Sequence, residues 1–150
     1  MKADQHRSNI NQFINRSFRD VADKDYIAAR ILHRTGGLES QFIWAAQQAI
    51  EKYFKAILLY NNISTSGSGH KLNELLTKTL NIENIDFDFP EDVIEFIGNL
   101  DQAADRYFEK PIMTQGSELL RLDKSVWYIR RYCQYLHGSF KDLHNNEVQR

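Results

Sequence analysis

The sequence predicts an all-α protein, a mostly up-and-down helical bundle. Apolar residues recur at steps of three and four along most of the chain, which is the period of a helix face packed on a core. No strand-like alternation of useful length occurs. The two prolines and seven glycines fall between the helical patterns. Short loops joining antiparallel helices account for all three observations.

The first helical pattern lies near the N-terminus. It consists of Ile10, Phe13, Ile14, Phe18 and Val21, and it resumes after residues 20–23 through Tyr26, Ala29 and Leu32. One bent helix and two separate helices both fit this pattern. Gly36 and Gly37 end it.

A second helix, expected over about residues 39–61, is apolar almost all the way round. Its one polar strip consists of Gln48, Glu51, Lys52 and Lys55. A surface helix needs only one apolar stripe, so this helix must lie at the centre of the bundle or at a subunit contact. Glu51 and Lys55 stand four residues apart and predict an ion pair on the helix surface, while Lys52 and Lys55 can also meet a phosphate.

Three shorter patterns complete the bundle. After a flexible loop at residues 64–69, one helix carries Leu72, Leu75, Leu76 and Leu80. Pro90 is expected as the first residue of the next, which turns Val93, Ile97, Leu100, Ala104 and Phe108 to the core. The last long helix is predicted to carry Leu119, Leu122, Val126, Ile129, Cys133 and Leu136.

Composition limits the classes of function. The 150 residues predict a single domain, 1–150, with a core of about 20–137 and flexible ends at 1–8 and 139–150. The net charge of -1 indicates no general affinity for nucleic acid, and residues 79–105 hold only acidic charges, which predicts a solvated acidic face. No apolar run approaches the roughly 20 residues that cross a bilayer. A soluble cytoplasmic protein without a membrane segment is expected.

Several kinds of site are excluded on sequence. The five histidines show no paired metal-ligand spacing, and the single Cys133 is expected to be a buried thiol, so no metal is predicted. The sequence around Gly67 and Gly69 lacks the lysine of a phosphate-binding loop, and no serine elbow is present. No cofactor is expected. Metal-free acid–base chemistry is the enzymatic route that stays open.

Three blocks of sequence resemble the HEPN family of small helical domains. They are QQAIEKYFKAILL at 47–59, GHKLNELL at 69–76 and DRYFEKP at 105–111. The resemblance implies a bundle of about four or five main helices that forms a homodimer. It also implies an RNA-directed role, in some members as a metal-independent ribonuclease, and a minimal nucleotidyltransferase as partner or antitoxin in a toxin–antitoxin pair.

Ribonuclease members of the family carry an arginine followed, after four to six residues, by a histidine. Arg130 and Arg131 both meet this spacing to His137. On one continuous helix, seven steps of about 100° bring Arg130 to within about 20° of His137, which favours Arg130 over Arg131. His137 would then exchange protons with RNA, and Arg130 would hold the phosphate. The alternative is structural, with Arg130 bound to a carboxylate such as Asp123 and His137 partly buried at the helix end.

Arg131, Arg106 and Lys55 are further candidates for contact with nucleic acid. Arg106 belongs to the Arg-Tyr pair of the family, although an ion pair near the helix end also explains it. His70 matches the family histidine that opens a helix, and a structural hydrogen bond to a neighbouring carboxylate is the competing role.

Three functional hypotheses follow. The first is a ribonuclease or toxin component in which Arg130 and His137 of both subunits share one cleft. The second is a non-catalytic module that binds RNA, a nucleotide or a nucleotidyltransferase through a bundle face. The third is a helical scaffold whose only function is its dimer face. Whether the chain is an enzyme, as a metal-independent endoribonuclease, is left open by its sequence.

Overall fold

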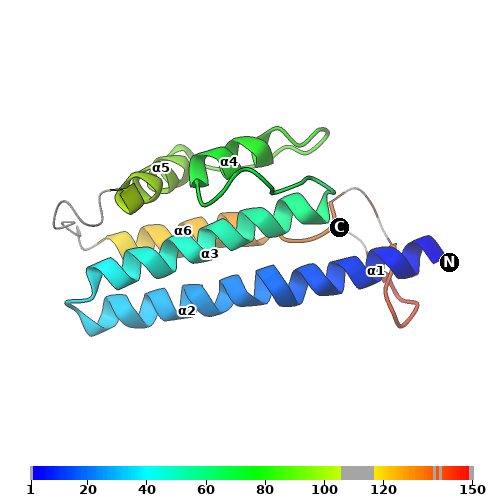
Figure 1. Cartoon of the computed structure of the whole chain (residues 1–150), viewed down its shortest axis with the longest axis horizontal. Coiled ribbons are helices and arrows are strands. Elements are labelled where there is room, and N and C mark those ends of the chain that lie inside the picture. Colours follow the sequence, from blue (N-terminus) through cyan, green and yellow to red (C-terminus); the bar gives the residue numbers. More distant parts are fainter. Residues whose placement is uncertain (1, 106–116, 137, 139, 149–150) are drawn as a thin grey trace.

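The fold is a helical bundle, seen in a computed structural model that describes residues 2–105, 117–136, 138 and 140–148 (Figure 1). The helices are α1 (Lys2–Ile14), α2 (Asp20–Thr35), α3 (Glu39–Tyr60), α4 (Leu72–Leu80), α5 (Glu91–Asp105) and α6 (Glu118–Arg130). A minimal antiparallel hairpin of β1 (Phe140–Lys141) and β2 (Glu147–Val148) follows. The predicted all-α bundle is confirmed.

The N-terminal helical pattern forms one long rod. Between α1 and α2 the chain stays helical through a π-helical segment, η1 (Asn15–Arg19), and Ile14 and Asp20 on either side keep right-handed helical angles. A wider π turn changes the direction of side chains without ending a helix. The single-helix alternative therefore holds, with the irregularity at 15–19 rather than at 20–23. Along this rod, α2 pairs with α3 and α1 extends beyond the bundle (Figure 1).

The central position predicted for α3 is confirmed. In Figure 1, α2 lies along one side of α3, α4 and α5 along the opposite side, and α6 behind it. Large side chains at 0% exposure point from α3 in several directions: Ile50, Tyr53, Phe54, Ile57 and Leu58. Burial of each such side chain contributes on the order of 1.5–3 kcal/mol. The apolar residues around α3 are therefore buried against helices on several of its sides.

Glu51 and Lys55 of α3 form the expected ion pair, but it does not lie on the helix surface as predicted. The Lys55 Nζ lies 2.5 Å from the Glu51 Oε1, but the Glu51 side chain is only 7% exposed. The loop before α4 folds over this part of α3, and the His70 Nδ1 lies 2.9 Å from the Glu51 Oε2. A carboxylate in such a place requires charged or hydrogen-bonding partners, and both basic groups provide them. The Lys52 Nζ is likewise bound, 2.5 Å from the Asp25 Oδ2.

The helices α4 and α5 follow most of the sequence pattern, but Leu80 at the end of α4 is 42% exposed, and the side chains of Ala104 and Phe108 lie outside the described part of the chain. Leu72, Leu75 and Leu76 of α4 are buried, as are Val93, Ile97 and Leu100 of α5. The backbone N–H of Leu72 donates to the Asp101 Oδ1 of α5 at 2.9 Å, so an acidic residue caps the start of α4. The carbonyl of Pro90 accepts from the N–H of Ile94 at 3.1 Å, consistent with Pro90 at the start of α5.

The predicted length of the last helix is wrong, because α6 ends at Arg130. Beyond it, the Tyr132 ring packs 4.8 Å from Phe87 and 5.6 Å from Phe89, and its hydroxyl accepts the N–H of Asp88 at 2.9 Å. This aromatic cluster holds the chain in a tight turn. Cys133 and Leu136 are nevertheless buried, at 3% and 4% exposure. The apolar spacing correctly predicted which side chains face the core, but a buried side chain does not require a helical backbone.

Among the described residues, none of the helices has the length and apolar character to cross a bilayer.

Replacing Ile57 by Ala should lower the free energy of unfolding by about 2–5 kcal/mol, because the side chain is fully buried and its loss leaves a cavity. Urea denaturation measures this. Ile94→Ala is the matched control at a site on α5 that is 38% exposed, and its effect should stay at about 1 kcal/mol or less. Equal effects of the two substitutions would contradict the central position of α3.

Candidate functional site

A broad concave surface lies between α2 and α6. It is an open groove of about 560 Å³, lined by Tyr26 of α2 and by Asp123, Val126, Trp127, Arg130 and Arg131 of α6 and its end. We call it the α2–α6 groove. Its volume is within the range of roughly 300–1,000 Å³ typical of small-ligand sites. It combines aromatic surface with two cationic side chains.

Hydrogen bonds connect α2 and α6, the two helices that border this groove. The Tyr26 hydroxyl donates to the Asp123 Oδ1 at 2.6 Å and accepts from Arg30 at 3.1 Å. Arg30 also forms an ion pair with Asp123. Asp123 is therefore bound by α2, and it is not the partner that the structural alternative gave to Arg130.

The carboxylate partner of Arg130 is Asp23. The Nε and Nη2 of Arg130 each donate to one oxygen of Asp23 at 2.7 Å, a bidentate pair that fixes the plane of the guanidinium. The buried Tyr53 of α3 donates its hydroxyl to the Asp23 Oδ1 at 2.6 Å. A chain of contacts thus runs from the core helix to the end of α6.

The ion pair changes the acid–base properties of its members. The hydrogen bond from Arg130 lowers the pKa of Asp23 by more than burial raises it, and the Tyr53 hydroxyl lowers it further. The same hydrogen bond raises the pKa of Arg130. Burial is the largest cause of the raised pKa of Tyr53, so its hydroxyl remains a donor. At neutral pH Asp23 is charged and Arg130 is held as a positioned cation.

Arg131 lies among three aromatic rings. Its guanidinium carbon is 5.2 Å from the ring centre of Trp127, 4.9 Å from that of Tyr128 and 5.0 Å from that of Tyr132. Its Nη2 also donates to the carbonyl and to the Oδ2 of Asp88, both at 3.2 Å. The negative faces of aromatic rings attract a guanidinium, so these contacts restrict the motion of the Arg131 side chain.

The structure brings together some of the predicted site residues. Arg130 and Arg131 both line the α2–α6 groove. The phase argument that favoured Arg130 required a helix continuous to His137, and α6 ends at Arg130. His137 and Arg106 lie outside the described residues, so the predicted catalytic pair of Arg130 and His137 stays a prediction.

Lys55 and His70 belong to a different cluster, with Glu51 between them. The Lys55 side chain is 18% exposed and its ammonium group is bound to Glu51, so its predicted contact with nucleic acid stays a prediction. His70 makes the expected hydrogen bond to a neighbouring carboxylate.

Sequence reasoning missed Asp23, Tyr26 and Trp127 as members of the site. The helical pattern indicates Tyr26 only as a core residue, and Asp23 only as part of a break between helices. The Asp23–Arg130 contact spans 107 positions, so no local spacing indicates it. One available signal was Trp127, a large aromatic residue outside the apolar period of the last helix.

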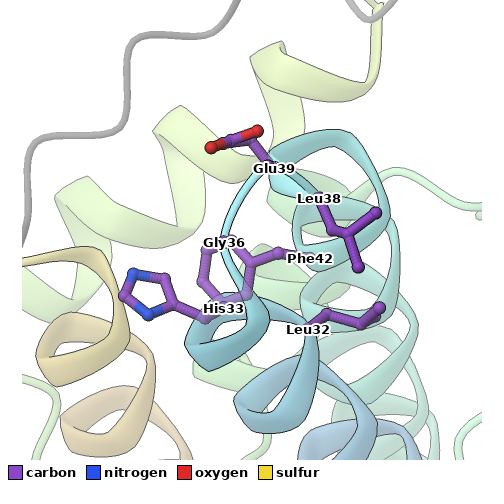
Figure 2. A pocket seen from close by; sticks show the side chains of 7 residues that line it. Leu32, His33, Gly36, Leu38, Glu39 and Phe42 are labelled. Carbon is purple, nitrogen blue, oxygen red and sulfur yellow. The ribbon is translucent and has the colours of Figure 1, made fainter.

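A smaller cavity of about 190 Å³ lies at the turn between α2 and α3 (Figure 2). Leu32 and Leu38 point to one side of it, while His33 and Glu39 point away from them. The His33 ring packs edge-on against Phe42, with centroids 5.0 Å apart. Gly36 and Gly37 adopt positive φ angles of 74° and 69°, which only glycine takes readily, and they allow the tight turn. These features explain the cavity as a product of the turn.

Metal and thiol chemistry find no site in the described part of the chain. No group of three or more His, Cys, Asp or Glu side chains gathers there in an arrangement that would hold a metal ion. Cys133 is buried, its Sγ lies 3.5 Å from the carbonyl of Tyr53, and burial raises the pKa of its thiol. It is the inert core thiol that the sequence predicted.

The stability contributed by Asp23 should depend on pH. Its pKa in the folded state lies below the ordinary aspartate value of 3.8, so its ionised form stabilises the fold above that pH, and this contribution is lost as pH falls toward the folded-state pKa. Asp23→Asn should therefore cost about 1 kcal/mol at pH 7 and less near pH 3. Urea denaturation of both proteins at the two pH values measures the difference. A cost that does not change with pH would rule out the ion pair as its source.

The HEPN domain model matches residues 16–111, which is more than half of the chain. The match covers η1, α2, α3, α4 and α5, and it ends before α6 and the two arginines of the groove. No curated protein and no solved structure matches the chain. The family match agrees with the three sequence blocks and with the helical bundle, and this chain therefore belongs to the HEPN domain family.

Proposed function

We propose that this protein binds single-stranded RNA in the α2–α6 groove. HEPN domains are associated with nucleotide- and RNA-related roles. The observation that carries the proposal is the pair of arginines at the end of α6, both of which line the groove beside Trp127. Guanidinium groups bind phosphates through planar pairs of N–H donors, and exposed aromatic rings bind unpaired bases.

Both arginines retain donors for a phosphate while bound to carboxylates. A guanidinium has five N–H donors. In the described part of the chain, Arg130 uses its Nε and Nη2 for Asp23, and the hydrogen bonds of Arg131 come from its Nη2. The remaining N–H groups can meet a phosphate without breaking either ion pair. RNA binding would therefore depend on these local contacts, because a net charge of -1 gives no general attraction to nucleic acid.

The sharper version of the proposal is metal-independent cleavage of RNA, with Arg130 and His137 as the catalytic residues. His137 would accept the proton of a 2′-hydroxyl, and the 2′-oxygen would attack the adjacent phosphorus. As the bond between phosphorus and the 5′-oxygen breaks, the 2′-oxygen and 3′-oxygen would share the phosphorus in a cyclic phosphate, the leaving 5′-oxygen would take a proton from water, and no metal would be required. Arg130, held by Asp23, would stabilise the negative charge that develops on the phosphate.

A second candidate function is binding to a protein partner, such as the minimal nucleotidyltransferase of a toxin–antitoxin pair. The observation that favours it is the exposure of two large apolar side chains on α6, Leu120 at 72% and Trp127 at 63%. They stand seven residues apart and therefore lie on the same face of α6, and apolar side chains that share an exposed face often mark an interaction surface.

We also propose a homodimer that forms through the outer side of α2. Ile27 and Ile31 stand one helical turn apart on this helix and are 54% and 60% exposed. A second copy of the chain would remove both from water.

Arg130→Ala should abolish cleavage of a labelled RNA pool in the presence of EDTA, and it should weaken RNA binding about 10-fold or more, because a charge-assisted contact to phosphate contributes about 1.5–3 kcal/mol. Fluorescence anisotropy measures binding, and gel analysis measures cleavage.

The matched control is Arg121→Ala, which removes an exposed arginine of α6 that lies outside this groove. If Arg130→Ala and His137→Ala both leave cleavage and toxicity on overexpression at wild-type levels, the ribonuclease version is wrong. If RNA binding is also unchanged in Arg130→Ala, the proposed groove is wrong.

Ile27→Glu combined with Ile31→Glu should convert the dimer to a monomer at micromolar concentration. In the dimer both isoleucines would be buried, so their loss should weaken the association free energy by on the order of 3 kcal/mol, or about 150-fold in the dissociation constant. Light scattering coupled to size-exclusion chromatography measures the mass. Leu80→Glu on α4, at a side chain that is 42% exposed, is the control and should remain dimeric. A wild-type protein that is monomeric throughout would refute the proposed dimer.

A further inference from the structure

Trp127 combines high exposure with a restricted position. It is 63% exposed although it lines the α2–α6 groove. Its ring meets that of Tyr128 edge-on, with centroids 4.8 Å apart and planes at 82°. An exposed indole held by neighbours presents a large apolar surface with little conformational entropy left to lose on binding.

The Trp127 ring lies against the cationic side chain of Arg131, which is held in place. The guanidinium of Arg131 lies 5.2 Å from the centre of the Trp127 ring, and its Nη2 donates to the Asp88 Oδ2 at 3.2 Å. Arg130 lines the same groove and is held in plane by Asp23. The groove thus offers an aromatic face and two positioned guanidinium groups within one concave surface.

We propose that Trp127 is the stacking platform for an unpaired RNA base whose flanking phosphates are bound by Arg130 and Arg131. This inference rests on the proposed function, and it assigns the base-binding residue of the same groove. Nucleobases of any sequence have a π face, so the site would bind single strands with little sequence preference. Paired bases are stacked within a duplex and would not reach the indole.

RNA is favoured over a second protein as the occupant because of the residues that line the groove. Of its six lining residues, two are arginines and two are aromatic, whereas Val126 is the single aliphatic side chain. Its one carboxylate, Asp123, is already bound to Arg30. A protein partner that buried this surface would have to desolvate two ion-paired arginines, whereas a phosphate can contact their remaining N–H groups.

The two tryptophans of the chain provide a matched experiment. Trp44 on α3 is 61% exposed, nearly the same as Trp127 at 63%, but it does not line the groove. Trp44→Phe leaves Trp127 as the only indole, and Trp127→Phe leaves Trp44. Both variants are titrated with a short single-stranded oligoadenylate while tryptophan emission is recorded. Acrylamide quenching checks that the two indoles are equally accessible.

The Trp44→Phe protein should lose emission in a saturable way, because a stacked base quenches the indole, and the Trp127→Phe protein should show almost no change. By anisotropy of a labelled oligoadenylate, Trp127→Ala should bind about 5- to 150-fold more weakly, whereas Trp127→Phe should bind nearly as well as wild type. A melting curve for each variant confirms that it is folded. A duplex of the same length should leave the emission of Trp127 unchanged.

Each other outcome has a separate meaning. Wild-type binding by Trp127→Ala, without quenching of Trp127, would overturn the stacking role and leave RNA binding in place. Failure of every variant, including wild type, to bind oligoadenylate would overturn the proposed function as well. Emission from Trp127 that changes with protein concentration and does not respond to RNA would assign the groove to a second copy of the chain, and the inference would be wrong.

Discussion

Burial of α3 on several of its sides is the constraint on which the rest of the molecule depends. This helix of 22 residues is enclosed by α2, α4, α5 and α6, and each of these packs an apolar stripe against it. The outer helices are amphipathic for this reason, whereas α3 is apolar around most of its circumference.

Enclosure of α3 also determines where polar contacts form. A polar group that enters the core needs a hydrogen-bond partner, and the partners come from helices far away in the chain. Gln47 donates to the carbonyl of Leu100 at 2.5 Å, and Tyr53 donates to Asp23. The second of these contacts reaches the surface, because Asp23 in turn binds Arg130. The position of Arg130 in the groove therefore depends on Tyr53 in the core, through Asp23.

The end of α6 gives the groove its chemistry. Arg131 keeps right-handed helical angles at the end of α6, so its guanidinium meets the rings of Trp127 and Tyr128, four and three residues earlier on the same face. The turn that follows adds the ring of Tyr132 to this guanidinium, which also binds Asp88, while Arg130 remains against α2. Both arginines line one concave surface beside Trp127. The proposed base and phosphate contacts depend on this arrangement.

The sequence by itself determined the helical segments, the central place of α3, the buried thiol of Cys133 and the family, because each rests on local periodicity or on short blocks of residues. Only the tertiary structure decided that Glu51 is buried, that Asp23 rather than Asp123 binds Arg130, and that α6 ends at Arg130. These three results depend on partners that lie 19, 107 and more than 40 positions away along the chain. A helical period records which side chains face the core, but it carries no information about which distant group each polar side chain meets there.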